Sequence, residues 1–276
     1  MKKLGLLLVG LLFLLNVKGQ GSEIGLFVGA STYKGELKHE LFTLDYIHPV
    51  VGVQFRKNFN PHWSANINLN YGKISAADST SDDPFQLTRN LSFKSRILEL
   101  GGRFEFNFFP YQFAGGDWPF TPFLFIGVAG YRFNPLAELG DEDIELQPLG
   151  TEGQGTAAFP ERKKYKRTQI AIPYGGGFKF SLTRRIGINL EVGVRKTYTD
   201  YLDDVSTTYV DKAVLLENGI TAVILSDRTP GDLNDNFPGK QRGNSQDTDK
   251  YMFGGITFSF LLGKLNKQNC AFDMPQ

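Results

Sequence analysis

The segment Trp63–Lys73, WSANINLNYGK, alternates between two kinds of side chain along its length. One row is apolar and consists of Trp63, Ala65, Ile67, Leu69 and Tyr71. The other row consists of Ser64, Asn66, Asn68, Asn70 and Gly72. A period of two predicts a β-strand, because successive side chains of a strand point to opposite faces. This strand alone leaves open whether its apolar row faces a protein core or lipid.

The same alternation recurs along the chain with varying regularity. It predicts eight strands, over residues 22–34, 50–58, 63–73, 95–108, 121–133, 168–182, 185–199 and 251–262. The fifth is apolar on both faces, so its register stays open. Three connections are short, namely Phe59–His62, Phe109–Pro119 and Leu182–Arg185, and they alternate with long ones. Alternating short turns and long loops are typical of an outer-membrane barrel.

Charged residues in the middle of strands favour the same fold. They lie in the polar rows and are Glu99, Arg103, Glu105, Lys179, Glu191 and Arg195. A sandwich core would bury them at high cost, and an Arg or Lys facing lipid at mid-depth costs about 2–4 kcal/mol. We therefore predict an all-β fold, a single transmembrane antiparallel β-barrel of about eight strands with its apolar rows outward. A soluble β-sandwich is the alternative.

The N-terminus, MKKLGLLLVGLLFLLNVKGQ, has the charged start and short apolar run of a secretory signal peptide. We expect residues 1–19 to be removed, residues 20–262 to form the barrel, and residues 263–276 to be a periplasmic tail. Both termini would then be periplasmic, in the outer membrane of a Gram-negative bacterium. The single cysteine, Cys270, excludes an internal disulfide. Near-equal basic and acidic counts, 30 and 29, argue against a nucleic-acid partner.

An eight-stranded barrel has its interior filled by side chains. The six mid-strand charges are therefore predicted to form a salt-bridged lumenal cluster that closes the barrel, with a narrow polar path as the alternative. The chain has three histidines, His39, His48 and His62, and no GxSxG motif. GDLNDN, at residues 231–236, lacks the glycine and glutamate of a calcium-binding EF-hand loop. We predict no catalytic residues, no cofactor and no metal site, hence no enzyme.

Two segments are candidate contact sites. The basic stretch ERKKYKR offers Arg162, Lys163, Lys164, Lys166 and Arg167 for contact with lipopolysaccharide phosphates. An ordinary solvated loop is the alternative. The turn PYQFAGGDWP carries Tyr111, Phe113 and Trp118, which are candidate partner-binding anchors because aromatic residues dominate interfaces. Girdle aromatics at the membrane rim are the alternative.

Several longer motifs resemble one protein family. They are RNLSFKSRILEL (89–100), LQPLGTEGQG (146–155), RKTYTDYLDDVSTTYVD (195–211), LSDR (225–228) and QRGN (241–244). They resemble a Bacteroidota outer-membrane β-barrel family of formerly unknown function that includes the type IX secretion component PorG. The resemblance implies a non-enzymatic protein-transport component that contacts a periplasmic ring of PorK and PorN through its short turns and tail. A free-standing barrel, acting as a narrow channel or a surface-binding protein, is the alternative.

Overall fold

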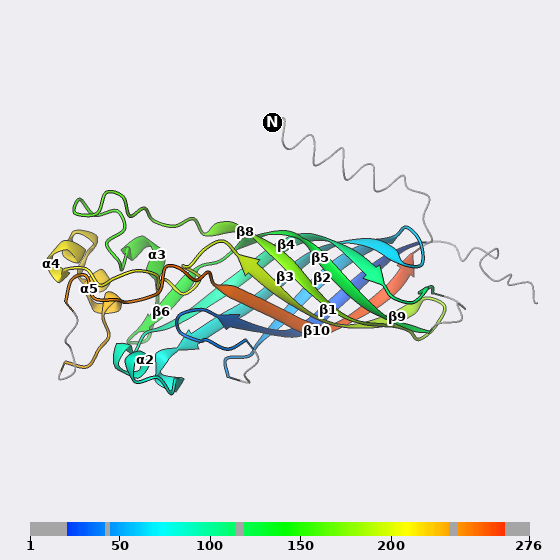
Figure 1. The fold of residues 1–276 in the computed structure, drawn as a ribbon, viewed down its shortest axis with the longest axis horizontal. Helices are drawn as coiled ribbons and strands as arrows, with labels where there is room; N and C mark the ends of the chain where they lie inside the picture. The colour runs from blue at the N-terminus through cyan, green and yellow to red at the C-terminus, as the bar shows by residue number, and fades with distance from the viewer. Residues whose placement is uncertain (1–20, 42–44, 114–118, 232–236, 263–276) are drawn as a thin grey trace, which may run out of the picture.

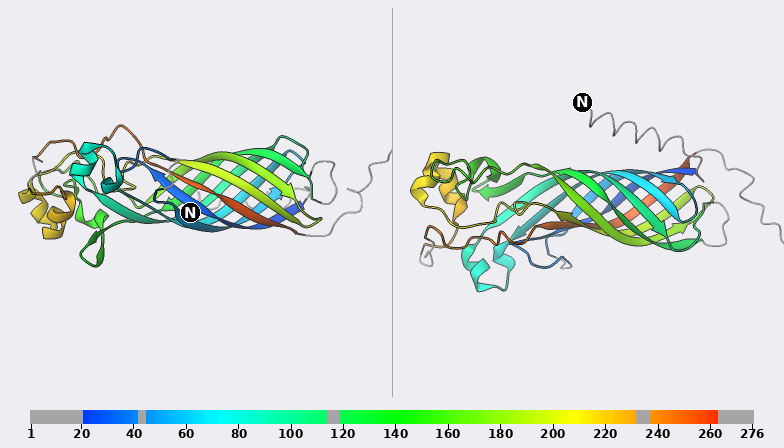
Figure 2. Two further views of the ribbon diagram at one scale, coloured as in Figure 1. Left: turned by 90° about the horizontal axis from the view of Figure 1, so that it is seen from below. Right: turned by 45° about the horizontal axis from the view of Figure 1, so that its top comes forward.

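A computed structural model describes residues 21–41, 45–113, 119–231 and 237–262 of the chain. Eight antiparallel strands form a closed barrel in the wall order β3-β2-β1-β10-β9-β8-β5-β4, and pairing of β3 with β4 closes it (Figures 1 and 2). The strands are β1 (Gly21–Lys34), β2 (His48–Asn58), β3 (Trp63–Ala77), β4 (Ser92–Asn107), β5 (Phe120–Arg132), β8 (Thr168–Ser181), β9 (Ile186–Thr197) and β10 (Lys250–Leu262).

The predicted fold is confirmed, and each predicted strand has a counterpart in the barrel. The largest differences in strand bounds are at the end of the barrel that carries the long loops. There β3 continues to Ala77 and β4 already begins at Ser92, so this hairpin projects beyond the rest of the wall. The predicted signal peptide and C-terminal tail lie outside the described residues.

Side-chain polarity follows the predicted arrangement. On β3, Trp63 and Tyr71 are exposed on the outside of the barrel, whereas Asn66, Asn68 and Asn70 are buried inside. The structure also settles the register of β5, whose Leu124, Ile126 and Val128 point outward and whose Phe123 and Phe125 point inward. The barrel is thus polar within and apolar without, the reverse of a water-soluble protein. Such a surface fits a lipid bilayer.

The long loops fold into an ordered cap at one end of the barrel, on the left in Figure 1. We use the name cap for residues 35–47, 78–91, 133–167 and 198–249, as far as the structure describes them. It contains the hairpin β6 (Pro135–Leu139) and β7 (Glu142–Glu145) together with α2 (Pro84–Arg89), α3 (Leu146–Leu149), α4 (Lys212–Leu215) and α5 (Ile220–Ser226). The short 3-10 helices η1 (Asp78–Thr80) and η2 (Leu216–Asn218) also belong to it.

Local sequence explains the boundaries of α2. Pro84 occupies the first turn, where its missing N–H is tolerated. The Asp83 side chain accepts a hydrogen bond from the Phe85 amide at 2.9 Å, which caps the helix start. Asn90 ends the helix in the left-handed conformation, with φ of 55°. No helix in the described part of the chain is long and apolar enough to cross a membrane.

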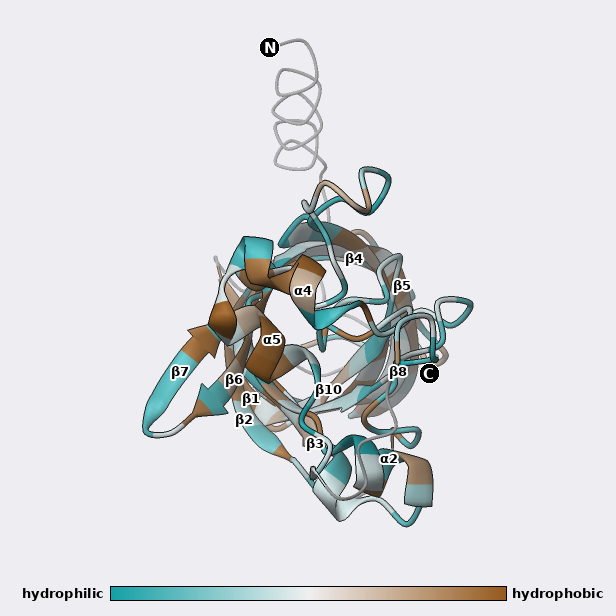
Figure 3. Cartoon of the chain, turned by 90° about the vertical axis from the view of Figure 1, so that its left-hand side faces the viewer, coloured by the Kyte–Doolittle hydropathy of each residue, from teal (hydrophilic) through white to brown (hydrophobic). Residues whose placement is uncertain are grey.

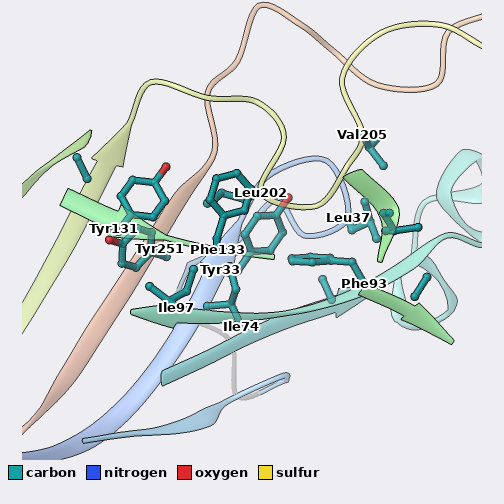
Figure 4. Close-up of a cluster of buried hydrophobic side chains, with 14 of the residues drawn as sticks. Tyr33, Leu37, Ile74, Phe93, Ile97, Tyr131, Phe133, Leu202, Val205 and Tyr251 are labelled. Carbon is teal, nitrogen blue, oxygen red and sulfur yellow. The ribbon is translucent and has the colours of Figure 1, made fainter. Parts of the chain in front are cut away.

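The inward face changes from polar to apolar where the barrel meets the cap. On β3 the buried row passes from Asn70 to Ile74, and on β4 from Glu99 to Ile97. Ile74 and Ile97 belong to a buried hydrophobic cluster that also includes cap residues such as Leu202 (Figure 4). Burying one such aliphatic side chain completely stabilises the folded state by about 1.5–3 kcal/mol. The cap is therefore held by an apolar core of the kind found in water-soluble proteins.

Candidate functional site

Glu105 lies at the centre of a buried ion-pair network inside the barrel. Its carboxylate is 2.8 Å from Arg56 Nε, 2.7 Å from Lys179 Nζ and 3.0 Å from Arg103 Nε. Arg56 also contacts Glu23 at 2.7 Å, because the register of β1 and β2 places the two residues directly opposite each other. Two of the three cations around Glu105 have a second acidic partner, since Arg56 also pairs with Glu23 and Arg103 with Glu191. The Lys179 ammonium instead also donates to the Asn107 side-chain oxygen at 2.9 Å.

A second group of polar side chains lies closer to the cap. The Glu99 carboxylate is 3.0 Å from Arg195 Nε and accepts hydrogen bonds from the Tyr251 hydroxyl at 2.7 Å and the Asn70 amide at 2.9 Å. The Arg195 guanidinium also lies over the Phe253 ring, 4.3 Å from its centroid. The remaining acid, Glu191, pairs with Arg103 at 2.7 Å. Every buried carboxylate of the barrel interior named here thus has a cationic partner.

Aromatic rings of β5 complete the filling of the interior. Phe125 lies under the Arg103 guanidinium at 4.4 Å, and Phe123 lies under the Lys179 ammonium at 4.6 Å. Such cation–π contacts add about 0.5–2 kcal/mol each. The lumen is packed with matched charges and rings, which leaves it closed.

The structure brings the six predicted lumenal charges together inside the barrel. They are Glu99, Arg103, Glu105, Lys179, Glu191 and Arg195. The sequence-based set missed Arg56 and Glu23. Arg56 lies in the polar row of its strand, which was a usable signal. Glu23 directly precedes the outward row Ile24, Leu26 and Val28, so the same alternation was a usable signal for it as well.

The predicted aromatic anchors are at the short-turn end, opposite the cap. Tyr111 is only 5% exposed, and its amide donates to the Pro61 carbonyl at 3.2 Å. Phe113 is half-buried against Gly187, where an added Cβ would come within 2.8 Å of its ring. The two side chains pack against the end of the barrel and do not project from it, so Tyr111 has little exposed surface that a partner could contact. Trp118 lies outside the described residues.

The basic segment is largely used within the cap. Arg162 donates to the Glu152 carbonyl at 2.8 Å, Lys164 to the Pro148 carbonyl at 2.6 Å, and Arg167 pairs with Glu145 at 2.7 Å. Lys163 and Lys166 remain exposed. Most of the cationic groups in this segment therefore stabilise the cap itself.

A different set of cations lies on the outer wall, above the apolar belt. Lys73 of β3 is directly opposite Arg96 of β4, and Arg132 of β5 is opposite Leu98, two residues from Arg96. We call Lys73, Arg96 and Arg132 the cation row. Among the described residues none of them has an ion-pair partner. Like charges facing each other across a strand pair are destabilising unless an anion joins them.

The motifs that carry the family resemblance converge in the cap. Glu152, from LQPLGTEGQG, accepts from Arg242 of QRGN at 2.9 Å and from the Ser206 amide at 2.9 Å. Arg242 also donates to the carbonyls of Asp204 at 2.7 Å and Ser226 at 3.0 Å. Burial raises the pKa of Asp204 to about 6, although the Arg242 charge acts against that shift. The separate motifs thus form one buried polar network.

Arg89, the last residue of α2, connects this network to Asp78. Its guanidinium forms two contacts with the Asp78 carboxylate, both 2.7 Å long. It also donates to the carbonyls of Arg242 at 2.6 Å and Glu36 at 3.0 Å. Removing Arg89 would leave Asp78 buried without a cation. We therefore expect the cap to behave as one cooperative unit.

Fold and polarity together define a small β-barrel of the membrane-spanning class, closed inside and capped at one end. The chain belongs to the family described as Domain of unknown function (DUF6089), whose profile matches residues 2–147. Among curated proteins, none matches the sequence.

Solved structures with a similar fold include Neisserial surface protein A (NspA), at 7% identity with a TM-score of 0.43, covering 88% of this chain and 97% of that one. Another is Ail of Yersinia pestis in complex with the heparin analogue sucrose octasulfate, at 10% identity with a TM-score of 0.40, covering 88% and 99%. The outer-membrane enzyme PagL is similar at 10% identity with a TM-score of 0.32, covering 87% and 99%.

Proposed function

We propose that this protein is a non-enzymatic outer-membrane β-barrel that acts by contacting other molecules rather than by conducting solutes. The observation that carries the proposal is the closed interior, in which Arg103, Glu105 and Glu191 form buried ion pairs beside the Phe125 ring. A barrel filled in this way has no path for solutes through its interior, so only its outer surfaces are available to other molecules.

The partner we propose is the periplasmic ring of a type IX secretion system, formed by PorK- and PorN-like proteins. The proposal rests on the sequence resemblance to the family of PorG. The short-turn end is the side from which such a ring would be reached, since barrel turns are short on the periplasmic side. There the turn after β8 presents Leu182, Arg184 and Arg185, all exposed. These replace Tyr111 as the contact residues we propose.

Affinity purification of the tagged protein from gently solubilised outer membranes tests this role. We expect PorK- and PorN-like proteins in a fixed ratio to the barrel, read by mass spectrometry. Reversing the charge of the turn with Arg184→Glu and Arg185→Glu should reduce their recovery several-fold. Lys163→Glu, at the cap end, is the matched control. Recovery of the barrel alone, with the ring intact in the same extract, would exclude the secretion role.

The closed interior has its own test. Purified protein in a planar bilayer should show no discrete conductance steps. A steady single-channel current would instead support the alternative of a narrow channel.

A surface-binding role is the second candidate, favoured by the cap. Leu216, Ile220 and Ile224 are exposed on η2 and α5, and parts of α4 and α5 at the cap end are coloured as hydrophobic in Figure 3. We also place the lipopolysaccharide contact on the cation row rather than on residues 161–167, because the row faces outward beside the apolar belt. Vesicle binding by purified protein, compared with and without lipopolysaccharide, tests this contact.

A further inference from the structure

Three acidic side chains from distant parts of the sequence meet where the cap joins the barrel. They are Glu36, just after β1, Asp200, just after β9, and Asp249, just before β10. One carboxylate oxygen from each lies within 4.8 Å of the others. Glu36 lies in the connection between β1 and β2, whereas Asp200 and Asp249 lie at the two ends of the connection between β9 and β10. The sequence contains no local motif that joins them. This explains why the sequence predicted no metal site.

The cluster is buried and only partly satisfied. Glu36 is 7% exposed, and its Oε2 atom is buried without a hydrogen-bond partner among the described residues. Both carboxylate oxygens of Asp200 are also buried without such a partner. Asp249 is better satisfied, since it accepts from the Leu202 amide at 2.8 Å and from the Tyr33 hydroxyl at 3.2 Å. Buried carboxylate oxygens without partners carry a high desolvation cost.

The nearby buried cations do not compensate these acids. The Arg89 guanidinium is matched by Asp78, and that of Arg242 is matched by Glu152. A fourth acid, Asp203, adds to the excess, since it is 1% exposed and accepts from the Val205 amide at 2.9 Å. Lys34, Lys196 and Lys250 line the adjoining pocket, but among the described residues no cation forms an ion pair with Glu36, Asp200 or Asp249.

The chemistry of the donors fits a hard divalent cation. Ca²⁺ prefers six to eight oxygen ligands, including carboxylates, carbonyls and water. A pocket of about 350 Å³ adjoins the cluster, and Asn244, Gln246 and Thr248 contribute to its lining. It provides a route for an ion from solvent and room for bound water. Burial and the charge of Asp200 raise the pKa of Glu36 to about 8, and burial raises that of Asp200 to about 7. These shifts are the expected sign of uncompensated acids.

We propose that Glu36, Asp200 and Asp249 form a binding site for a divalent cation, with Ca²⁺ as the preferred ion. The ion ties the start of the β1–β2 connection to both ends of the β9–β10 connection, and so fastens the cap to the barrel. Its affinity should be in the range of extracellular calcium modules, with a Kd of about 0.1–1 mM.

Luminescence of Tb³⁺ as a calcium substitute tests the site on the full-length mature protein, refolded in detergent after chelator treatment at pH 7.5. We expect tyrosine-sensitised Tb³⁺ emission, with the Tyr33 ring close to the cluster, and displacement of the Tb³⁺ by Ca²⁺. Glu36→Gln and Asp200→Asn should each weaken displacement by Ca²⁺ at least tenfold, as expected for loss of one ligand charge. Glu142→Gln, on the exposed β6–β7 hairpin, should leave it unchanged.

A second readout covers the case in which the variants fail to fold. In the wild-type protein, Ca²⁺ should slow hydrogen exchange of the Leu202 amide, which is bonded to Asp249. The absence of saturable binding up to about 10 mM Ca²⁺ would overturn the proposal, because it lies well above the expected range. Binding that is equal in wild type, Glu36→Gln and Asp200→Asn would overturn it as well. In either case the acids would be held by shared protons instead.

Discussion

Arg103 and Glu191 face each other across the barrel interior through two parallel contacts, each with a nitrogen–oxygen distance of 2.7 Å. Their strands, β4 and β9, are separated in the wall by β5 and β8. The pair therefore ties opposite sides of the barrel together. Removing one partner of a buried ion pair leaves the other charge uncompensated, which costs about 3–5 kcal/mol.

The first prediction follows from this pair. Arg103→Ala should lower the free energy of unfolding by about 3–5 kcal/mol, because Glu191 loses its buried partner. Arg167→Ala is the matched control, since Arg167 pairs with Glu145 at the surface and should lose less than about 1 kcal/mol. Urea unfolding of both variants in lipid vesicles measures the difference. Equal losses would mean that the interior pair is hydrated.

The outward apolar belt gives a second prediction. Ile126 is 61% exposed on the barrel wall and Ile220 is 62% exposed on the cap, so the two differ mainly in their surroundings. Ile126→Arg should cost about 2–4 kcal/mol in a bilayer, because the charge is placed among lipid chains. Ile220→Arg should change stability by less than about 0.5 kcal/mol, because the cap faces water. A small effect at both positions would argue against a membrane-embedded wall.

The barrel could be predicted from the sequence because its membrane section demands two distinct faces on every strand. Asn66, Asn68 and Asn70 alternate with apolar residues for this reason, and the pattern is visible without knowing any neighbour in space. The position of β5 was predicted, but which of its two apolar faces points inward was not. Its inward Phe123 and Phe125 are apolar, and their role as platforms for Lys179 and Arg103 appears only when the strands are assembled.

The fold of the cap could not be predicted from patterns in the sequence, for a related reason. Its stability depends on contacts between distant segments, such as the pair of Glu152 and Arg242, which are 90 residues apart. Its helices are short and carry no long periodic signal, as in α3 and α4. The acidic cluster where the cap meets the barrel could not be predicted either, since Glu36 and Asp249 look like ordinary loop residues in the sequence.

The cation row yields a third prediction. Neutralising it with Lys73→Gln and Arg96→Gln should weaken lipopolysaccharide binding about fivefold per residue, since each cation near an anionic surface contributes about 1 kcal/mol. The loss should shrink at high salt, because exposed charges are screened. Lys163→Gln on the cap is the control and should have no effect. Titration of the detergent-solubilised protein with lipopolysaccharide, followed by native mass spectrometry, measures the change.

A fourth prediction concerns pH. Burial raises the pKa of Glu36 from 4.5 to about 8, and burial with the charges of neighbouring acids raises that of Asp249 as well. A carboxyl whose pKa is higher in the folded state binds more protons when folded between the two values. The stability of the cap should therefore fall as pH rises from about 5 to about 8, by on the order of 1–2 kcal/mol in chelator-treated protein.

The groups that surround Glu36 from every side bear on this prediction. They are Tyr33 and Lys34 on β1, His39 after β1, Arg89 on α2, Lys196 on β9, Lys250 on β10, and Asp200, Asp203, Asp247 and Asp249 in the connection between β9 and β10. Hydrogen exchange at the Leu202 amide, corrected for intrinsic rates, reports the opening of the cap at each pH. The amide of Phe104 in the barrel wall serves as an internal reference. Glu36→Gln should flatten the pH dependence, and so should saturating Ca²⁺, because an ion replaces the protons. Protection of Leu202 that rises with pH in the chelated wild-type protein would contradict the prediction, since it would mean that these carboxylates are stabilised in their charged form.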